Sequence, residues 1–212
     1  MQPLKTVTRG GCVNGAFKKS AEFGSGTRFI NVSDAYSDNF EVKEGALDRV
    51  VASSEELERY SVARGDVFFV RSSLKLDGVG RSAIAGLLSE PAIFDCHLVR
   101  IRPKSDAMNP EFLIAYLNSA VRAQLVSRAN LVTMATMDQG KIATLPTVVP
   151  PLPEQAAIVG DLRRIWASTS GFTSIVSSNI ALLREYRSAL ITAAVTGQLD
   201  IREHEKKMEA LA

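Results

Sequence analysis

The chain has 212 residues, of which 46% are apolar, and a formal net charge of +2. This length and apolar content predict a folded protein with one core of about 150 residues plus an appendage, and they exclude a disordered tail. The 25 Lys and Arg residues against 23 Asp and Glu residues neither require nor exclude a nucleic-acid partner, because acidic residues elsewhere can offset a basic face.

The N-terminal part is predicted to consist of short strands separated by turns. Aromatic or β-branched runs bounded by Gly, Ser or Pro occur at 27–32, 66–71 and 97–102, which is typical of strands. Between the first two runs, Ser53 has a glutamate three residues later, as in a capping box. This spacing predicts a short helix that ends before Arg64.

A second helix is expected from Asn109 and Pro110 onward, because these residues suit the cap and first turn of a helix. Residues 141–149 are predicted to be extended, and they lead to the prolines of 150–153. Proline fixes its own φ and restricts the preceding residue, so a stiff elbow and a domain boundary are expected there. The buried side of the second helix would carry Phe112, Leu113, Tyr116, Leu117, Val121 and Leu125.

One long helix is predicted from 154 to 196, followed by Gly197 in the position of a left-handed cap. A helix of about 43 residues would be roughly 64 Å long, more than a globular helix needs, so its outer half is expected to pair with a partner. Seam residues recur at alternating steps of four and three, which indicates a coiled coil of about five heptads. The seam positions are Ile158, Leu162, Ile165, Thr169, Phe172, Val176, Asn179, Leu183, Tyr186, Leu190 and Ala193.

Two features of this helix leave alternatives open. Residues 168–171 are weak helix formers, so a kink or a tight crossing is an alternative to a straight helix. Asn179 lies on the seam, where it is either a tolerated polar position or a register lock that needs a matching partner for its buried amide.

Cysteine content and hydropathy indicate a cytoplasmic setting. Cys12 and Cys96 are too few and too far apart for a disulfide framework, and neither belongs to a CxxC pair. Residues 1–11 lack the apolar stretch of a signal peptide, and no apolar run reaches about 18 residues. Secretion and membrane spanning are therefore not expected.

Both ends of the long helix carry motifs typical of one protein family. PLPEQ occupies 151–155, while RSALI and AVTGQLD occupy 187–191 and 194–200. With these motifs the chain resembles the specificity subunit of type I restriction–modification systems, in a half-length form. Looser similarities to the target recognition domain of that family are FINV at 29–32, GDVFF at 65–69, RSS at 71–73 and GVG at 78–80.

The resemblance implies an α+β target recognition domain at 1–150, a long helix at 151–200 and a charged tail at 201–212. Subunits of that family hold two recognition domains separated by two antiparallel helices, and each domain reads one half of a split site in double-stranded DNA. This chain is therefore expected to form a homodimer or to pair with another half-subunit; a homodimer would read a two-fold symmetric site.

The resemblance also implies partners for the long helix. It would dock methyltransferase subunits, which carry S-adenosylmethionine and methylate adenine, and a restriction subunit that translocates DNA where one is present. The chain itself would be non-catalytic and would need no cofactor of its own.

Three motifs that suggest chemistry have simpler interpretations. Residues 78–83 match a dinucleotide-binding loop, but no strand runs straight into them, so a surface loop near DNA is expected instead. Residues 109–112 differ by one position from an adenine-methyltransferase motif, but the third position is Glu111, so a helix start is favoured. Cys96 and His97 are neighbours on a predicted strand, where their side chains would point to opposite faces. No catalytic residue and no metal site are predicted.

DNA contacts are expected from basic and polar residues in the loops between strands. Lys and Arg would bind phosphates, while a few side chains would reach base edges in the major groove. The alternative for each residue is ordinary solvated surface. The segment 71–81 is favoured, because a mobile polar loop there follows a strand that fixes its root. The candidates are Lys18, Lys19, Arg28, Arg71, Ser72, Ser73, Lys75, Arg81, Arg128, Asn130, Thr133 and Lys141.

Two questions stay open at the level of sequence. The alternative function is that of a non-catalytic coiled-coil assembly protein whose globular head binds protein. A natural half-subunit and the latter half of a longer chain are both compatible with these residues.

Overall fold

The computed structural model describes residues 1–37, 39–119, 121–127, 129–131 and 135–198, and the side chains of Leu131 and 170–174 lie outside this description. The predicted contacts Arg128 and Thr133, the Phe172 side chain and the tail at 201–212 therefore lie outside the described residues. The chain forms two compact units, Met1–Val159 and Gly160–Ala212. The first unit thus continues past the expected elbow and includes the first turns of the long helix.

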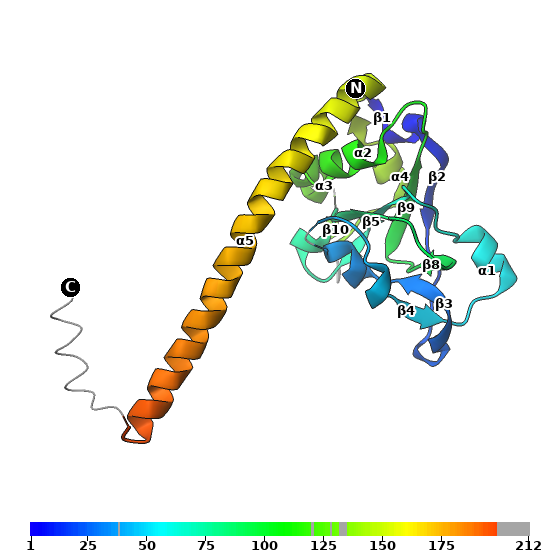
Figure 1. The fold of residues 1–212 in the computed structure, drawn as a ribbon. Coiled ribbons are helices and arrows are strands. Elements are labelled where there is room, and N and C mark those ends of the chain that lie inside the picture. Colours follow the sequence, from blue (N-terminus) through cyan, green and yellow to red (C-terminus); the bar gives the residue numbers. More distant parts are fainter. Residues whose placement is uncertain (38, 120, 128, 132–134, 199–212) are drawn as a thin grey trace. The chain divides into compact units, whose positions relative to one another are not determined.

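The first unit combines strands and helices in the α+β arrangement that the sequence predicts (Figure 1). The strands are β1 Gln2–Pro3, β2 Thr8–Asn14, β3 Phe23–Ile30, β4 Asp48–Val50, β5 Val67–Val70, β6 Ser72–Ser73, β7 Ser82–Ile84, β8 Ala92–Phe94, β9 Leu98–Pro103, β10 Asn130–Leu131, β11 Ala135–Thr136 and β12 Pro146–Thr147. The α-helices are α1 Ser54–Arg59, α2 Pro110–Leu117, α3 Val121–Ser127, α4 Gln139–Ala143 and α5 Leu152–Val195. Short 3-10 turns are η1 Leu4–Val7, η2 Ser20–Glu22, η3 Val32–Tyr36, η4 Glu44–Ala46 and η5 Leu76–Gly78.

The described strands form small sheets around one central antiparallel sheet. The central sheet has the order β2-β9-β5-β7. A second sheet has the order β4-β3-β8, in which β3 is antiparallel to β4 and parallel to β8. The remaining pairings are β10-β11-β6 and β1-β12. In the small β10-β11-β6 sheet, β6 follows directly after the end of β5.

The continuous apolar run of β5 is explained by burial on both faces of the central sheet. Val67 and Phe69 pack into a core with α2, α3 and α4, while Phe68 and Val70 pack into a second core with Phe94 of β8. Successive side chains of a strand point to opposite faces, so a strand buried on both sides needs apolar residues at every position. This strand is the fixed root from which the segment at 71–81 departs.

Several predicted elements are confirmed with shifted ends. α1 begins after Ser53, whose side chain accepts a hydrogen bond from the Glu56 amide at 3.2 Å, and α2 begins after Asn109, which caps it in the same way. The prediction of one continuous helix from Asn109 past Leu125 is wrong, because α2 ends at Leu117 and a separate helix, α3, begins at Val121. Asn118 explains this end: its Nδ2 donates to the carbonyls of Ile114 and of Ser82 in β7, which ties the chain to the sheet.

The expectation of extended chain at 141–149 is only partly correct. Residues up to Ala143 form α4, because Asp138 caps this helix by accepting from the Lys141 amide at 2.8 Å. Only the short strand β12 is extended in this stretch.

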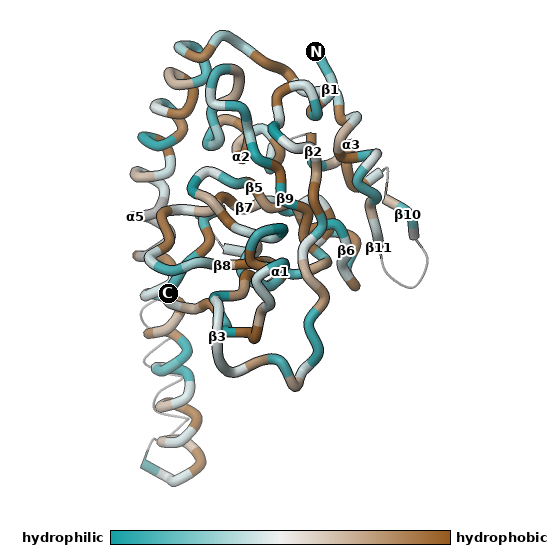
Figure 2. The backbone as a smooth tube through the Cα atoms, turned by 90° about the vertical axis from the view of Figure 1, so that its right-hand side faces the viewer, coloured by the Kyte–Doolittle hydropathy of each residue, from teal (hydrophilic) through white to brown (hydrophobic). Residues whose placement is uncertain are grey.

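The long helix is confirmed as α5, which continues from Leu152 to Val195 without interruption at 168–171. The Thr169 hydroxyl donates to the Ile165 carbonyl at 2.6 Å, so this polar stretch remains bonded to its own helix. Gly197 has a φ of 71°, and the amide of Gln198 donates to the carbonyl of Ala193 at 2.8 Å, which is a Schellman end. Figure 2 shows polar and apolar residues interspersed along α5. Among the helices of the described residues, none has the length and apolar character needed to cross a lipid bilayer.

Candidate nucleic-acid interface

A pocket of about 530 Å³ in the first unit brings together four of the predicted DNA contacts. It lies between η3, β6, η5 and the start of β7, beside the turn that precedes β9. The four predicted residues are Ser72, Ser73, Lys75 and Arg81. The remaining lining residues are Val32, Tyr36, Leu74, Asp77, Gly78 and His97.

Tyr36 organises one side of this pocket. The guanidinium carbon of Arg81 lies 5.3 Å from the centroid of the Tyr36 ring, within the range of a cation–π contact. The Tyr36 hydroxyl donates a long hydrogen bond of 3.4 Å to Ser73 Oγ, which also accepts from the Lys75 amide at 3.2 Å. One aromatic residue therefore contacts both ends of the segment that the sequence favoured.

The GVG motif at 78–80 is not the surface loop that the sequence predicts, because all three residues are buried. Val79 belongs to the main core, and Gly80 has a φ of 80°. A Cβ atom on Gly78 would overlap the hydroxyl oxygens of Ser73 and Tyr36. The motif therefore allows η5 to approach Tyr36 closely.

Three more candidates lie along the small sheet next to the pocket. Arg71 precedes β6; its amide donates to the His97 carbonyl at 2.9 Å, and its carbonyl accepts from Met137 at 2.8 Å. Asn130 pairs with Thr136 across β10 and β11, and Lys141 Nζ donates to Asn130 Oδ1 at 2.8 Å. Because β6 belongs to the same sheet as β10, backbone pairing joins segments that are far apart in sequence.

The early candidates lie outside this pocket. The side chain of Lys18 is only 2% exposed, and its Nζ contacts Glu56 and Glu22 and donates to the carbonyl of Val51 at 2.8 Å. Burial acts to lower the pKa of Lys18, but the hydrogen bonds with Glu56 and Glu22 outweigh it and raise this pKa. Arg28 lies 3.5 Å from Glu90, whereas Lys19 is exposed.

The prediction that Cys96 and His97 diverge is wrong. These residues form a turn rather than a strand, and their side chains converge with that of Asp95. Asp95 Oδ1 lies 2.9 Å from His97 Nδ1, which lies 3.4 Å from Cys96 Sγ. Burial, with a contribution from Asp95, raises the pKa of the Cys96 thiol while Arg71 acts against it. The raised pKa disfavours the thiolate form of Cys96 that a cysteine nucleophile requires.

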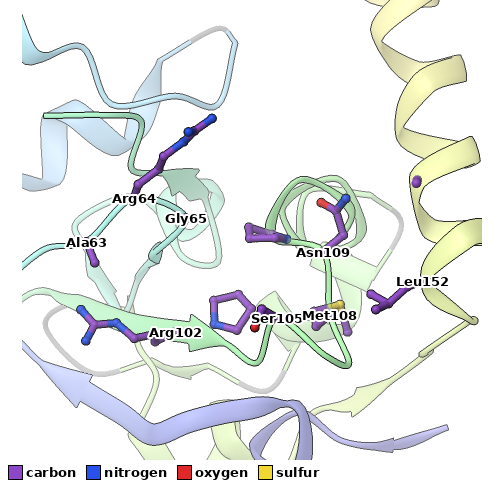
Figure 3. Close-up of a pocket in the computed structure, with 11 residues that line it drawn as sticks. Ala63, Arg64, Gly65, Arg102, Ser105, Met108, Asn109 and Leu152 are labelled. Atoms are coloured by element: carbon purple, nitrogen blue, oxygen red, sulfur yellow. The ribbon is translucent and has the colours of Figure 1, made fainter.

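A second pocket, of about 430 Å³, lies at the root of α5 within the first unit (Figure 3). Arg64 and Arg102 line one part of it, while Asn109 and Leu152 line another. Arg102 is paired with the buried Asp66 through its Nε at 2.6 Å and its Nη2 at 2.7 Å. This arginine is therefore held within the fold by its ion pair with Asp66.

The PLPEQ motif anchors α5 through Gln155, which is fully buried. Its Oε1 accepts from the Asn109 amide at 2.8 Å, and its Nε2 donates to the carbonyls of Ala107 and Pro150 at 3.0 and 2.8 Å. One side chain thereby satisfies backbone groups on the segment before α2 and on the proline elbow.

Three lining residues of the first pocket lie outside the segment 71–81 that the sequence favoured, namely Val32, Tyr36 and His97. Tyr36 is separated from Ser73 by 36 intervening residues, and no local pattern links them. From the sequence, His97 suggests a metal ligand or part of a nucleophilic pair, and the interpretation favoured there is a lone histidine. The charged and polar residues of 71–81 are the local signal that the sequence offers. They identify the part of the pocket formed by this segment and not the part formed by Tyr36 and His97.

Comparisons with known proteins relate the chain to one group. No family model matches. The type I restriction enzyme EcoKI specificity subunit of Escherichia coli K12 is 24% identical over 192 residues, which cover 88% of this chain and 40% of the relative. The StySPI specificity subunit of Salmonella potsdam is 25% identical over 154 residues, covering 71% and 33% respectively. The chain is similar in sequence to type I specificity subunits. It spans 33% to 40% of the length of these two relatives.

Solved structures from type I restriction–modification systems share the fold. A chain from a structure of type I restriction–modification complex assembly aligns with a TM-score of 0.67 at 20% identity, covering 91% of this chain and 44% of its own. The HsdS subunit of Thermoanaerobacter tengcongensis gives 0.57 at 20% identity, covering 80% and 37%. The S subunit of M. genitalium gives 0.55 at 12% identity, covering 87% and 43%. The recognition-domain fold expected from the resemblance is thus confirmed.

Proposed function

We propose that this chain is the non-catalytic DNA-recognition component of a type I restriction–modification complex and reads one half of a bipartite DNA site. The observation that carries the proposal is the similarity to the EcoKI specificity subunit over 88% of the chain. Its partners would be methyltransferase subunits that bind S-adenosylmethionine and, where present, a restriction subunit. In this proposal the recognition domain at 1–150 would bind DNA. The long helix at 151–200 would pair with a second subunit and dock the methyltransferase subunits, and a charged tail would follow at 201–212.

The chemistry of the first pocket supports this function. Ser72, Ser73, Lys75 and Arg81 supply hydrogen-bond donors, and Asp77 supplies an acceptor. Such a mixture suits base edges, which present both acceptors and donors in the major groove. Lys75 is exposed and would contact the DNA backbone beside the pocket.

The test is binding of the chain with its methyltransferase subunit to a duplex found by methylation mapping in cells with and without this gene. We expect at least roughly a thousandfold preference for the mapped site over unrelated DNA, measured by fluorescence anisotropy at moderate salt. Lys75→Ala should weaken binding at all sequences and reduce the salt slope by about one.

Lys5→Ala is the matched control, because Lys5 is an exposed lysine on η1 that does not line the pocket. Its affinity and salt slope should equal those of the wild type. If the wild-type complex binds every duplex equally well, the proposal is wrong, and the head has another ligand such as a protein.

A further inference from the structure

We infer that Arg81, held on the face of Tyr36, reads a guanine in the recognised half-site, an inference that rests on the proposed function. Among the described residues, the Arg81 side chain has no hydrogen-bond or ion-pair partner, and its contact is with the Tyr36 ring at 5.3 Å. Within the described part of the chain, the N–H groups of its guanidinium therefore have no acceptor. A ring contact restrains an arginine without a hydrogen bond to these donors, since the cation is attracted by the quadrupole of the aromatic ring.

The position of Tyr36 is fixed from two further directions. Its hydroxyl donates to Ser73 Oγ on β6, and Gly78 leaves the space that both hydroxyl groups fill. Tyr36 thus joins η3, β6 and η5. An arginine restrained on such a support loses less conformational entropy on binding than an arginine on a free loop, because its rotamers are already limited.

The chemistry of the donors selects the base. Guanine presents two neighbouring acceptors, O6 and N7, in the major groove, and the planar fork of arginine matches both. Adenine pairs one acceptor with one donor and is read by Asn or Gln, neither of which lines this pocket within the described part of the chain. A carboxylate accepts from the cytosine amino group, so Asp77 in the same pocket suits the partner of that guanine.

Asp77 also argues against a phosphate as the occupant. A phosphate bound by Arg81 would share the pocket with a carboxylate of the same charge sign, which is unfavourable at short range. A base edge carries no net charge and does not meet this repulsion. The pocket is therefore better suited to reading a base than to anchoring the backbone.

The experiment selects duplexes from a random pool with the chain bound to its methyltransferase subunit, comparing wild type with variants. Arg81→Ala should lose the preference for guanine at one position of the half-site by about tenfold or more, while preferences elsewhere persist. Tyr36→Leu should reduce the preference for guanine at the same position. Tyr36→Phe keeps the aromatic ring and should therefore keep this preference. Arg59→Ala is the matched control, because Arg59 lies 5.5 Å from the ring of Tyr60 but lines neither pocket described above.

A base analogue tests the contact without altering the protein. Replacing that guanine with 7-deazaguanine removes the N7 acceptor, so wild-type affinity should fall while Arg81→Ala is unaffected. An Arg81→Ala protein that keeps every base preference, or that loses affinity equally on all sequences, overturns the inference and leaves DNA recognition intact. A wild type that selects no sequence instead contradicts the proposed function itself.

Discussion

At the scale of single residues, Gln155 shows how a motif at the start of a helix acts through buried hydrogen bonds. Its side chain makes three hydrogen bonds to the backbone in a site with no solvent exposure. A buried amide donor or acceptor that loses its partner costs about 1–3 kcal/mol. An apolar residue of similar size could not make these hydrogen bonds, so we expect the glutamine to stabilise the start of α5 on the first unit.

Gln155→Leu should lower the free energy of unfolding by about 2 kcal/mol, because the Asn109 amide and two carbonyls lose their partner. Urea denaturation followed by circular dichroism measures this change. The exposed neighbour Glu154 provides the control, since Glu154→Gln should alter stability by less than about 0.5 kcal/mol. Equal stability of Gln155→Leu and wild type would show that the junction does not depend on these bonds.

At the scale of elements, a buried lysine joins η2, α1 and the end of β4. Lys18 contacts Glu22 of η2 and Glu56 of α1 and donates to the carbonyl of Val51. The pKa of Glu56 is lowered first by its hydrogen bond with Lys18 and then by the amide of Ser53. The pKa of Glu22 is lowered first by the amide of Lys19 and then by Lys18. These ionised groups hold short elements that have little regular backbone pairing.

The pH dependence of stability follows from the sign of these shifts. A carboxylate whose pKa is lowered by folding contributes stability above its unfolded value of about 4.3, and this contribution disappears as pH falls through the folded value. Lys18→Met should therefore be less stable than wild type at pH 7, and the difference should shrink below pH of about 4. Thermal unfolding of both proteins at pH 7 and below pH of about 4 measures this difference in stability. A difference that stays constant with pH would assign the loss to packing instead of charge.

At the scale of the whole molecule, the outer part of α5 carries apolar side chains that its own chain leaves exposed. Ile165, Val176, Leu183 and Tyr186 are between 53% and 66% exposed, whereas Ile158 packs against the main core of the first unit. Leu162 and Leu190 are partly exposed, and Asn179 is exposed. We propose that this seam pairs with the same helix of a second copy or of another half-subunit, which would place two recognition domains on one split DNA site.

Leu183→Glu should weaken such pairing by about tenfold or more, because it removes an apolar contact and places a charge on the seam. Light scattering over a concentration series measures the dissociation constant. Ser178→Glu adds the same charge on the opposite side of the helix, where pairing should be unaffected. A wild type that stays monomeric at every concentration would contradict pairing with its own copy, and an excess of another half-subunit would then be the partner to test.

The sequence by itself determined the elements whose signals are local. α5 and its glycine end follow from seam spacing and from Gly197, α1 follows from the capping residues, and β5 follows from its apolar run, because each depends on neighbours within a few residues. Only the tertiary structure decided how α2 ends, that Lys18 is buried, and that Cys96 and His97 converge. The pocket likewise depends on Tyr36 meeting Ser73 and Arg81 from a distant segment. Such contacts depend on chain folding between residues far apart, and no local spacing encodes them.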